Sequence, residues 1–223
     1  MKISKDKSRS THISVFDLDR TLIVSNCSVH FCRYLVSKGI LSPLTLLHSA
    51  LYYFRHVFLN MTPSELHSRI FERFLKGRSL ESIEKEVDAF LERYLKSALY
   101  FPVLCQLKLA QHLGHYTLIL SNSPHFLVKK IAEALGVSQW RATEYAVDKE
   151  QKLCHIASIM QGDEKASCVL KVAEELGIPS SQITAYSDSI WDLPLLLTAG
   201  KAIAVHPDRK LRAYSLKHEW KII

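Results

Sequence analysis

Side chains that bind metal ions and phosphate recur at or near the ends of short apolar runs in this sequence. They are Asp17, Asp19, Ser121, Asn122, Lys165, Asp188 and Asp192. Carboxylate oxygens are the ligands that a hard divalent cation prefers, and a lysine together with hydroxyl groups binds and neutralises phosphoryl oxygens. If the fold brings these side chains together, the residue types predict a site for a divalent cation and a phosphate group.

Apolar runs that alternate with helical segments supply the elements that must position these side chains. The expected strands are 12–16, 115–120, 183–186 and 201–205, the expected helices are roughly 124–135, 164–176 and 190–198, and 142–159 is expected to form a hairpin around the turn DKEQK. The alternation predicts an α/β fold with a parallel, doubly wound sheet. Ligands of such sheets bind at the carboxyl ends of the strands, which is where most of the polar residues stand.

A helical insertion interrupts this alternation. Residues 27–99 contain no convincing strand, and helices are expected near 43–59, 63–75 and 80–96. Pro43 and Pro63 suit the first turn of a helix, and Ser79 suits an N-cap. Helices inserted after the first strand predict a cap over the active edge of the sheet. The expected organisation is therefore a core of 13–26 and 100–223, a helical cap of 27–99 and a basic tail of 1–12.

Four motifs in order carry a resemblance to a known family. FDLDRTL at 16–22 matches DxDxT, Ser121 ends the apolar run LILS, Lys165 stands in QGDEKAS, and YSDSIWDLPLL at 186–196 resembles GDSxxD. Each motif alone is weak, but four in the right order are specific. The sequence resembles the haloacid dehalogenase-like (HAD) phosphohydrolases, subfamily IB, in the phosphoserine-phosphatase-like branch. The resemblance covers 13–223 and implies a HAD-type Rossmann-like core with an inserted helical cap of the C1 type.

The resemblance implies a role for each acidic residue of the first motif. Asp17 would be the nucleophile that attacks phosphorus and forms an aspartyl-phosphate, and Asp19 would protonate the leaving alcohol and then deprotonate water. Dehalogenases lack an acid at the position of Asp19, so its presence favours phosphoester chemistry. Asp17 and Asp19 are two residues apart at the end of an extended strand, so their side chains are expected to lie on the same side.

The resemblance also implies the ligands of a Mg²⁺ ion and of the phosphate group. Mg²⁺ would be held by the carboxylates of Asp17 and Asp188 and by the main-chain carbonyl of Asp19, with Asp192 orienting the site from behind. The implied phosphate-binding residues are Ser121, Asn122 and Lys165. Lys165 would also offset the repulsion between the nucleophile and the phosphate dianion.

Three departures from the family pattern bear on the substrate. Arg20 stands where many members have Gly, Ser or Asn, and Ser187 replaces the usual Gly of the fourth motif. Asn26 stands near the position where phosphoserine phosphatases have a carboxylate for the substrate ammonium. Arg20 and Asn26 are therefore candidate substrate contacts. An arginine that would hold the serine carboxylate is not evident in the sequence, where Arg69 and Arg73 are candidate equivalents. We expect phosphoserine to be a poor substrate and a less polar leaving group to be preferred.

The resulting functional prediction is a Mg²⁺-dependent phosphomonoesterase that acts on a small phosphorylated metabolite or a lipid-derived phosphate. Phosphoserine phosphatase proper and a phosphotransferase, which would pass the phosphoryl group to an alcohol, are the alternatives. A non-catalytic phosphate-binding module is the least favoured, because a decayed site would have lost its costly charges. The sequence leaves the oligomeric state open.

Composition excludes several other classes of protein. The chain has 223 residues, of which 48% are hydrophobic, so it can build the core of one domain with an insertion. Its five cysteines include no CxxC pair, which is typical of a reduced, cytoplasmic protein, and the charged N-terminus lacks the apolar stretch of a signal peptide. The net charge of +7 resides in 1–12 and 201–223 without an aromatic-interleaved basic stripe, so no nucleic-acid partner is expected.

Residues 40–59 form the most apolar stretch of the insertion. It is interrupted by Pro43, His48, Arg55 and His56. These residues argue against a transmembrane segment and favour a buried or interfacial helix, which leaves peripheral membrane contact open. The aromatic group Tyr52, Tyr53 and Phe54 is expected to lie in the core of the cap, with an exposed patch for a lipid or apolar substrate as the alternative.

Overall fold

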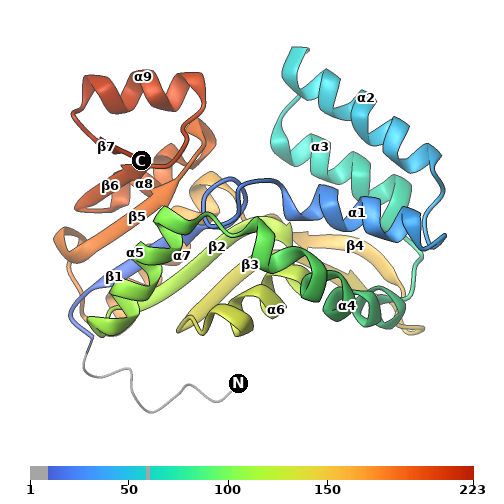
Figure 1. Cartoon of the computed structure of the whole chain (residues 1–223), viewed down its shortest axis with the longest axis horizontal. Coiled ribbons are helices and arrows are strands. Elements are labelled where there is room, and N and C mark those ends of the chain that lie inside the picture. The colour runs from blue at the N-terminus through green and yellow to red at the C-terminus, as the bar shows by residue number, and fades with distance from the viewer. Residues whose placement is uncertain (1–9, 59–60) are drawn as a thin grey trace.

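The computed structural model describes residues 10–58 and 61–223 and contains one seven-stranded sheet with the order β4-β3-β2-β1-β5-β6-β7 (Figure 1). The strands are β1 (Ile13–Asp17), β2 (Tyr116–Pro124), β3 (Gln139–Val147), β4 (Leu153–Ser158), β5 (Ile183–Ser187), β6 (Lys201–Ala204) and β7 (Lys221–Ile222). All neighbours are parallel except β3 and β4. The predicted α/β fold with a parallel sheet is confirmed. Most of the expected basic tail, residues 1–9, lies outside the described residues.

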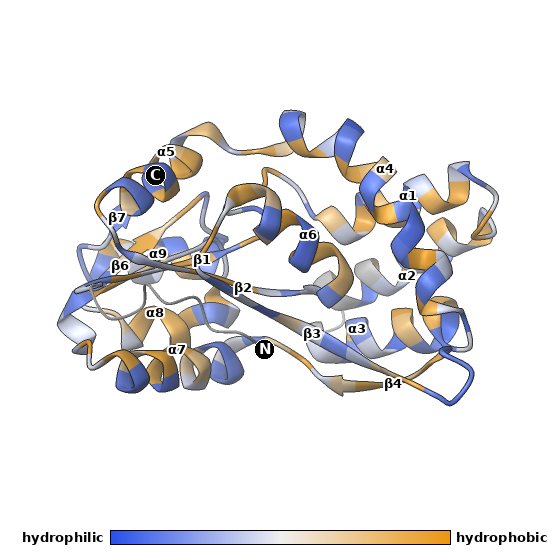
Figure 2. Ribbon diagram, turned by 90° about the horizontal axis from the view of Figure 1, so that it is seen from below, coloured by the Kyte–Doolittle hydropathy of each residue, from blue (hydrophilic) through white to orange (hydrophobic). Residues whose placement is uncertain are grey.

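Helices pack on both faces of the sheet (Figure 2). They are α1 (Cys27–Ser37), α2 (Leu44–Phe58), α3 (Pro63–Ile70) with a π-helical turn at Phe71–Leu75, α4 (Leu80–Ala98), α5 (Phe101–His112), α6 (His125–Leu135), α7 (Gly162–Leu176), α8 (Leu193–Thr198) and α9 (Arg209–Lys217). Alternate residues of the central strands face opposite layers. Phe16 and Ile119 pack with α1, α4, α5 and α6, whereas Val15 and Leu118 pack with α7 and α8. Burial on both faces explains the continuous apolar runs of these strands.

The central position of β1 determines where the site forms. β1 pairs in parallel with β2 on one side and β5 on the other, so that Phe16 is level with Ile119 and Tyr186. The carboxyl ends of the three strands therefore lie side by side. The predicted hairpin is also present, but β3 begins at Gln139 rather than near 142, because its first residues pair in parallel with β2 and extend the main sheet.

Helices α1 to α4 form the insertion between β1 and β2, on the right in Figure 1. The predicted helix starts at Pro63 and after Ser79 are confirmed: Thr62 and Glu65 form a capping box at α3, and Ser79 caps α4, whereas α2 begins one residue after Pro43. The segment between the π-helical turn and α4 is tied to the β3–β4 hairpin, because the Gly77 N–H donates to the Leu153 carbonyl at 2.7 Å. This bond fixes the outer helices next to the sheet.

The prediction that Tyr52, Tyr53 and Phe54 form the core of the insertion is wrong for Phe54. Its side chain is 53% exposed, because it lies on the side of α2 that faces away from α3 and α1. Tyr52 is partly buried, and the Tyr53 side chain and residue 59 lie outside the described part of the chain. No helix in 10–58 or 61–223 is long and apolar enough to cross a membrane.

Candidate active site

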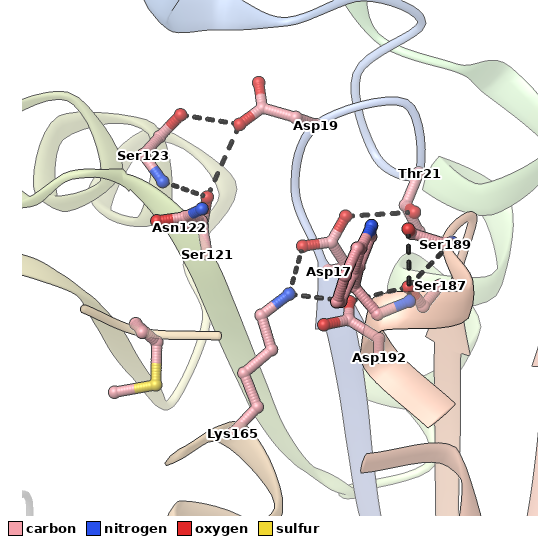
Figure 3. A network of polar contacts seen from close by, with 12 residues as sticks. Asp17, Asp19, Thr21, Ser121, Asn122, Ser123, Lys165, Ser187, Ser189 and Asp192 are labelled. Atoms are coloured by element: carbon pink, nitrogen blue, oxygen red, sulfur yellow. Dashed lines mark hydrogen bonds and ion pairs between the residues drawn. The ribbon is translucent and has the colours of Figure 1, made fainter. Parts of the chain in front are cut away.

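Every charged side chain that is buried in the described part of the chain lies at the carboxyl edge of the central strands. The four are Asp17, Lys165, Asp188 and Asp192, each at most 8% exposed. Charged groups are almost never buried unless they are paired, bind a ligand or take part in chemistry. The structure thus brings four of the predicted site residues into one cluster, from β1, α7 and the segment after β5. Figure 3 shows three of them, Asp17, Lys165 and Asp192.

Lys165 lies at the centre of this cluster. Its Nζ donates to Asp17 Oδ1 and to Asp192 Oδ2, both at 2.7 Å. Burial alone would lower the pKa of Lys165, but the two carboxylates raise it above its ordinary value, so the ammonium stays charged. Gly162 at the start of α7 permits this approach, because a Cβ there would lie 2.9 Å from the main-chain oxygen of Trp191.

The cluster contains more negative than positive charge. Burial raises the pKa of Asp17 to about 7, with Asp192 adding to the rise and Lys165 opposing it. Burial also raises the pKa of Asp188 to about 8, with Asp17 and Asp192 adding to it and Arg20 opposing. Carboxyl groups whose pKa is raised by burial and by one another are typical of functional sites.

The donor set of this cluster fits a hard divalent cation. Asp17 and Asp188 offer buried carboxylate oxygens, and the Asp19 main-chain carbonyl lies two residues beyond Asp17. Within 10–58 and 61–223, no three His, Cys, Asp or Glu side chains are grouped so that they could hold a metal ion by themselves. A cation here would therefore take main-chain, water or substrate oxygens in addition to the carboxylates.

Asp19 lies beyond the end of β1, in a turn, and its carboxylate faces away from Lys165 (Figure 3). Asp19 Oδ2 accepts a hydrogen bond from Ser123 Oγ at 2.6 Å, and Oδ1 accepts one from the Cys27 N–H at 2.6 Å. Asp19 is close enough to Asp17 to add to the rise of the Asp17 pKa, and the expectation that the two side chains lie on the same side stays a prediction. The Asp19 carboxylate is held by the first turn of α1 and the end of β2.

Two serines that the sequence analysis did not single out complete the surroundings of Asp19. Ser123 is buried, and because its hydroxyl donates to Asp19, Ser28 of α1 must be the donor in the 2.6 Å bond between the two serines. Ser121 Oγ accepts from the Ser123 N–H at 3.0 Å and donates to Asp19 at 3.5 Å. The sequence could have indicated Ser123, because Ser121 and Ser123 are two residues apart and such residues lie on the same face of a strand. The Oδ1 of Asn122, between them, accepts from Thr143.

The loop after β5 is held by two residues whose roles were not foreseen. Ser187, the residue that departs from the family pattern, donates to Asp192 Oδ2 at 2.7 Å. Asp208, the N-cap of α9, accepts from the Ile190 N–H at 2.8 Å, and its own N–H donates to the Asp188 carbonyl at 2.8 Å. The loop that carries Asp188 and Asp192 is therefore fixed at both ends.

A comparison with protein families agrees with this geometry. The family model described as haloacid dehalogenase-like hydrolase matches residues 14–197. The chain belongs to this family. It is therefore an enzyme of the hydrolase class, and the matched range contains the whole buried cluster of carboxylates and lysine.

Individual relatives of this HAD hydrolase cover almost its entire length. It is 28% identical over 223 residues to "Probable phosphatase Rv3661" of Mycobacterium tuberculosis (strain ATCC 25618 / H37Rv), a match that covers 96% of this chain and 76% of the relative. Among solved structures, a protein of unknown function from Bordetella pertussis Tohama I has a TM-score of 0.84 at 20% identity, covering 96% and 98% of the two chains. A substrate-bound phosphoserine phosphatase complex has a TM-score of 0.72 at 18% identity, covering 96% and 93%. The fold is phosphoserine-phosphatase-like.

The two candidate substrate contacts of this HAD hydrolase lie in the segment between Asp19 and α1. Arg20 has a φ of +61° and is close enough to Asp188 to oppose the rise of its pKa. Asn26 is the N-cap of α1, where its Oδ1 accepts a hydrogen bond from the Val29 N–H at 3.0 Å. The Asn26 oxygen thus caps the start of α1. A substrate contact by Arg20 or by Asn26 stays a prediction.

Proposed function

We propose that this hydrolase is a Mg²⁺-dependent phosphomonoesterase that forms an aspartyl-phosphate on Asp17. The observation that carries the proposal is the buried cluster itself, in which the Lys165 ammonium donates to both Asp17 and Asp192 at 2.7 Å. A cluster of buried carboxylates is costly to fold, and a divalent cation with a bound phosphate group would use all of its members. The phosphatase names of the relatives support the same reaction.

In the first half of the reaction, an Asp17 carboxylate oxygen attacks phosphorus in line with the ester bond. The new P–O bond forms as the ester P–O bond breaks, and Asp19 gives its proton to the leaving oxygen, which departs as an alcohol. Ser121 and Lys165 bind the phosphoryl oxygens, with Asn122 beside them, and offset the charge that gathers there. The Thr21 hydroxyl, which donates to Asp17 Oδ2 at 3.2 Å, and Lys165 hold the nucleophile in one orientation.

In the second half, a water molecule attacks phosphorus from the side that the alcohol has left. Asp19 takes the proton of this water, the bond between phosphorus and Asp17 breaks, and inorganic phosphate leaves. The carboxylates of Asp17 and Asp188 and the carbonyl of Asp19 would hold Mg²⁺, whose positive charge would lower the repulsion between nucleophile and phosphate. Asp192 acts as a positioning residue, because it holds Lys165 from behind.

The inserted helices serve as a cap of 27–99 over a core of 13–26 and 100–223. This assignment is supported by side-chain bonds between the two parts on either side of the site. Ser28 of α1 bonds Ser123 of β2 at 2.6 Å, and Ser64 of α3 bonds Gln161, next to the start of α7, at 2.9 Å. Both bonds join the insertion to segments that carry phosphate-binding residues.

The substrate is a small phosphate ester whose leaving group is less polar than serine, such as a metabolite or a lipid-derived phosphate. A pocket for phosphoserine needs a charged partner for the ammonium group, and charge-assisted bonds are about twice as strong as neutral ones. Asn26 carries no charge, and its Oδ1 already accepts the Val29 N–H. We expect the kcat/KM for phosphoserine to be among the lowest in a panel of phosphate esters. If the kcat/KM for phosphoserine is instead the highest, by about tenfold or ~1.4 kcal/mol of transition-state binding, the function is that of a phosphoserine phosphatase.

The chemical proposal is tested by Asp17→Asn with p-nitrophenyl phosphate as substrate. An amide cannot form the acyl-phosphate, so we expect turnover to fall by at least ~10³. Asp163→Asn, which makes the same change at an exposed acid on α7, should retain activity. Activity of the wild type should also disappear in EDTA and return with Mg²⁺. Activity of Asp17→Asn within a few-fold of wild type, or full activity in EDTA, would contradict the proposal.

The same assay distinguishes a hydrolase from a phosphotransferase. With an added alcohol acceptor, a hydrolase releases phosphate and p-nitrophenol in equal amounts, because water is the acceptor. A phosphotransferase releases less phosphate than p-nitrophenol, since part of the phosphoryl group passes to the alcohol. We expect equal amounts.

A further inference from the structure

Helix α2 presents an apolar stripe on its outer side. Its five members are each 53% to 67% exposed: Leu44, Leu47, Leu51, Phe54 and Phe58. They are three or four residues apart, so at 100° per residue they fall within an arc of about 80° on the helix. α2 packs on α3 and α1 through its other side, and it is the outermost helix of the insertion in Figure 1. Contiguous exposed apolar surface on a globular protein often marks a binding site.

Positive charge borders one edge of this stripe. At 100° per residue Arg55 and His48 lie about 20° to 40° beyond the stripe, on the same edge. Arg55 is exposed, and Arg73 joins this edge because its guanidinium donates to His48 Nε2 at 3.2 Å. The sequence has no acidic residue from 20 to 64. The stripe is therefore bordered by the cations Arg55 and Arg73, with no acidic residue on α2 itself.

We propose that α2 binds an anionic membrane surface, with its apolar stripe in the interface and its cationic edge at the lipid headgroups. An apolar face bordered by Lys or Arg is the pattern of helices that lie in the plane of a bilayer. α2 has 15 residues, or about 22 Å, which is shorter than the roughly 30 Å of a bilayer's hydrocarbon core. The helix therefore lies on the membrane. The proposal does not depend on the reaction assigned above.

A second copy of the chain fits this surface less well. The spacing of the stripe would also suit a helix pair, but such pairs are stabilised by opposite charges along their edges. The edge of α2 carries Arg55 and the His48–Arg73 pair, and α2 itself has no acidic residue to complement them. Two copies would therefore bring like charges together, whereas anionic headgroups complement them.

Vesicle co-sedimentation tests the proposal with the full chain. We expect the protein to sediment with phosphatidylcholine vesicles that contain about 30 mol % phosphatidylglycerol, and less with phosphatidylcholine alone. Leu47→Ser/Leu51→Ser should lower the partition coefficient by about tenfold or more. The matched control is Leu109→Ser/Leu113→Ser at α5, where the two side chains are 51% and 60% exposed, and it should bind as wild type.

Charge and folding are measured separately. Arg55→Gln should reduce the preference for anionic vesicles, and added salt should weaken binding of the wild type, because headgroup attraction is screened. Without vesicles, Leu47→Ser/Leu51→Ser should have the circular dichroism spectrum and the cooperative thermal unfolding of the wild type, which shows that it is folded. Wild-type protein that binds neither vesicle, or a double variant that binds like wild type, would overturn the proposal. If the wild type binds no vesicles but sediments as a dimer in sedimentation velocity, and the double variant sediments as a monomer, the stripe binds a second copy of the chain instead.

Discussion

Replacing Gly162 by alanine tests how the fold positions Lys165. An added Cβ at Gly162 would lie 2.9 Å from the main-chain oxygen of Trp191, in the loop between Asp188 and Asp192. A carbon and an oxygen at this distance must separate by about 0.5 Å to reach an ordinary contact. The start of α7 must therefore move away from the loop, and Lys165, one turn further along, moves with it.

Gly177, at the other end of α7, provides a matched control. Both glycines have positive φ, +40° at Gly162 and +65° at Gly177, but no atom lies within 4 Å of a Cβ at Gly177. Alanine in a left-handed conformation costs about 1–2 kcal/mol, and for a chain of this size each kcal/mol lowers the Tm by roughly 2–4 °C. Gly177→Ala should lose stability in this range, and Gly162→Ala should lose more, because the contact with Trp191 adds to the shared backbone strain. Only Gly162→Ala should also lower kcat, by about 10- to 100-fold, because a displacement below 1 Å misplaces the ammonium of Lys165.

Steady-state hydrolysis of p-nitrophenyl phosphate and calorimetric melting separate the two effects. Calorimetry should show a Tm decrease in both variants, which reports the backbone strain that they share. Kinetics should show a lower kcat for Gly162→Ala alone. If the two variants have the same kcat, the close approach of α7 to Trp191 does not position Lys165, and the reasoning is refuted.

Two further substitutions probe Asp19 and the contact between the insertion and the sheet. Ser123→Ala removes the hydroxyl that donates to Asp19 at 2.6 Å and should lower kcat by about 10- to 100-fold, because a bond to a charged group is worth roughly 1.5–3 kcal/mol. An unchanged kcat in a folded variant would contradict this. The Nε2 of His67 bonds Tyr145, and burial lowers the pKa of His67 from 6.5 to about 4. Below pH 6.5 the unfolded chain therefore binds a proton that the folded protein does not. The free energy of unfolding should fall by about 3 kcal/mol as the pH decreases to 4. Denaturant unfolding across this range should show that His67→Gln removes the loss and that His112→Gln, at an exposed histidine, retains it.

The main elements of the fold could be predicted because their signals are local. The run before Asp17 is apolar at Ile13, Val15 and Phe16, and β1 is buried at every residue, as expected for a central strand of a parallel sheet. The start of β3 could not be predicted in this way. Residues from Gln139 onward form a strand because they pair with Leu118 and its neighbours, more than 20 positions earlier in the chain. No local pattern reports such a pairing.

The site shows the same division between local and distant signals. Asp17, Lys165 and Asp188 were identified from motifs, and the structure brings all three into one buried cluster. Asp208 was not identified, because its role depends on the position of α9 beside the loop after β5. Phe54 was assigned to a core because aromatic side chains are usually buried, but the far side of α2 has no neighbour within the described chain.

The surroundings of Asp19 indicate how substrate choice and chemistry are connected. Its carboxylate is held by the Cys27 N–H of α1 and by Ser123, which in turn bonds Ser28 of α1. The orientation of the acid–base group in the proposed reaction therefore depends on where the insertion lies, whereas Asp17 and Lys165 are fixed by the core. A leaving group that shifts α1 changes proton transfer as well as binding. For this reason, differences between good and poor substrates should occur in kcat as well as in KM.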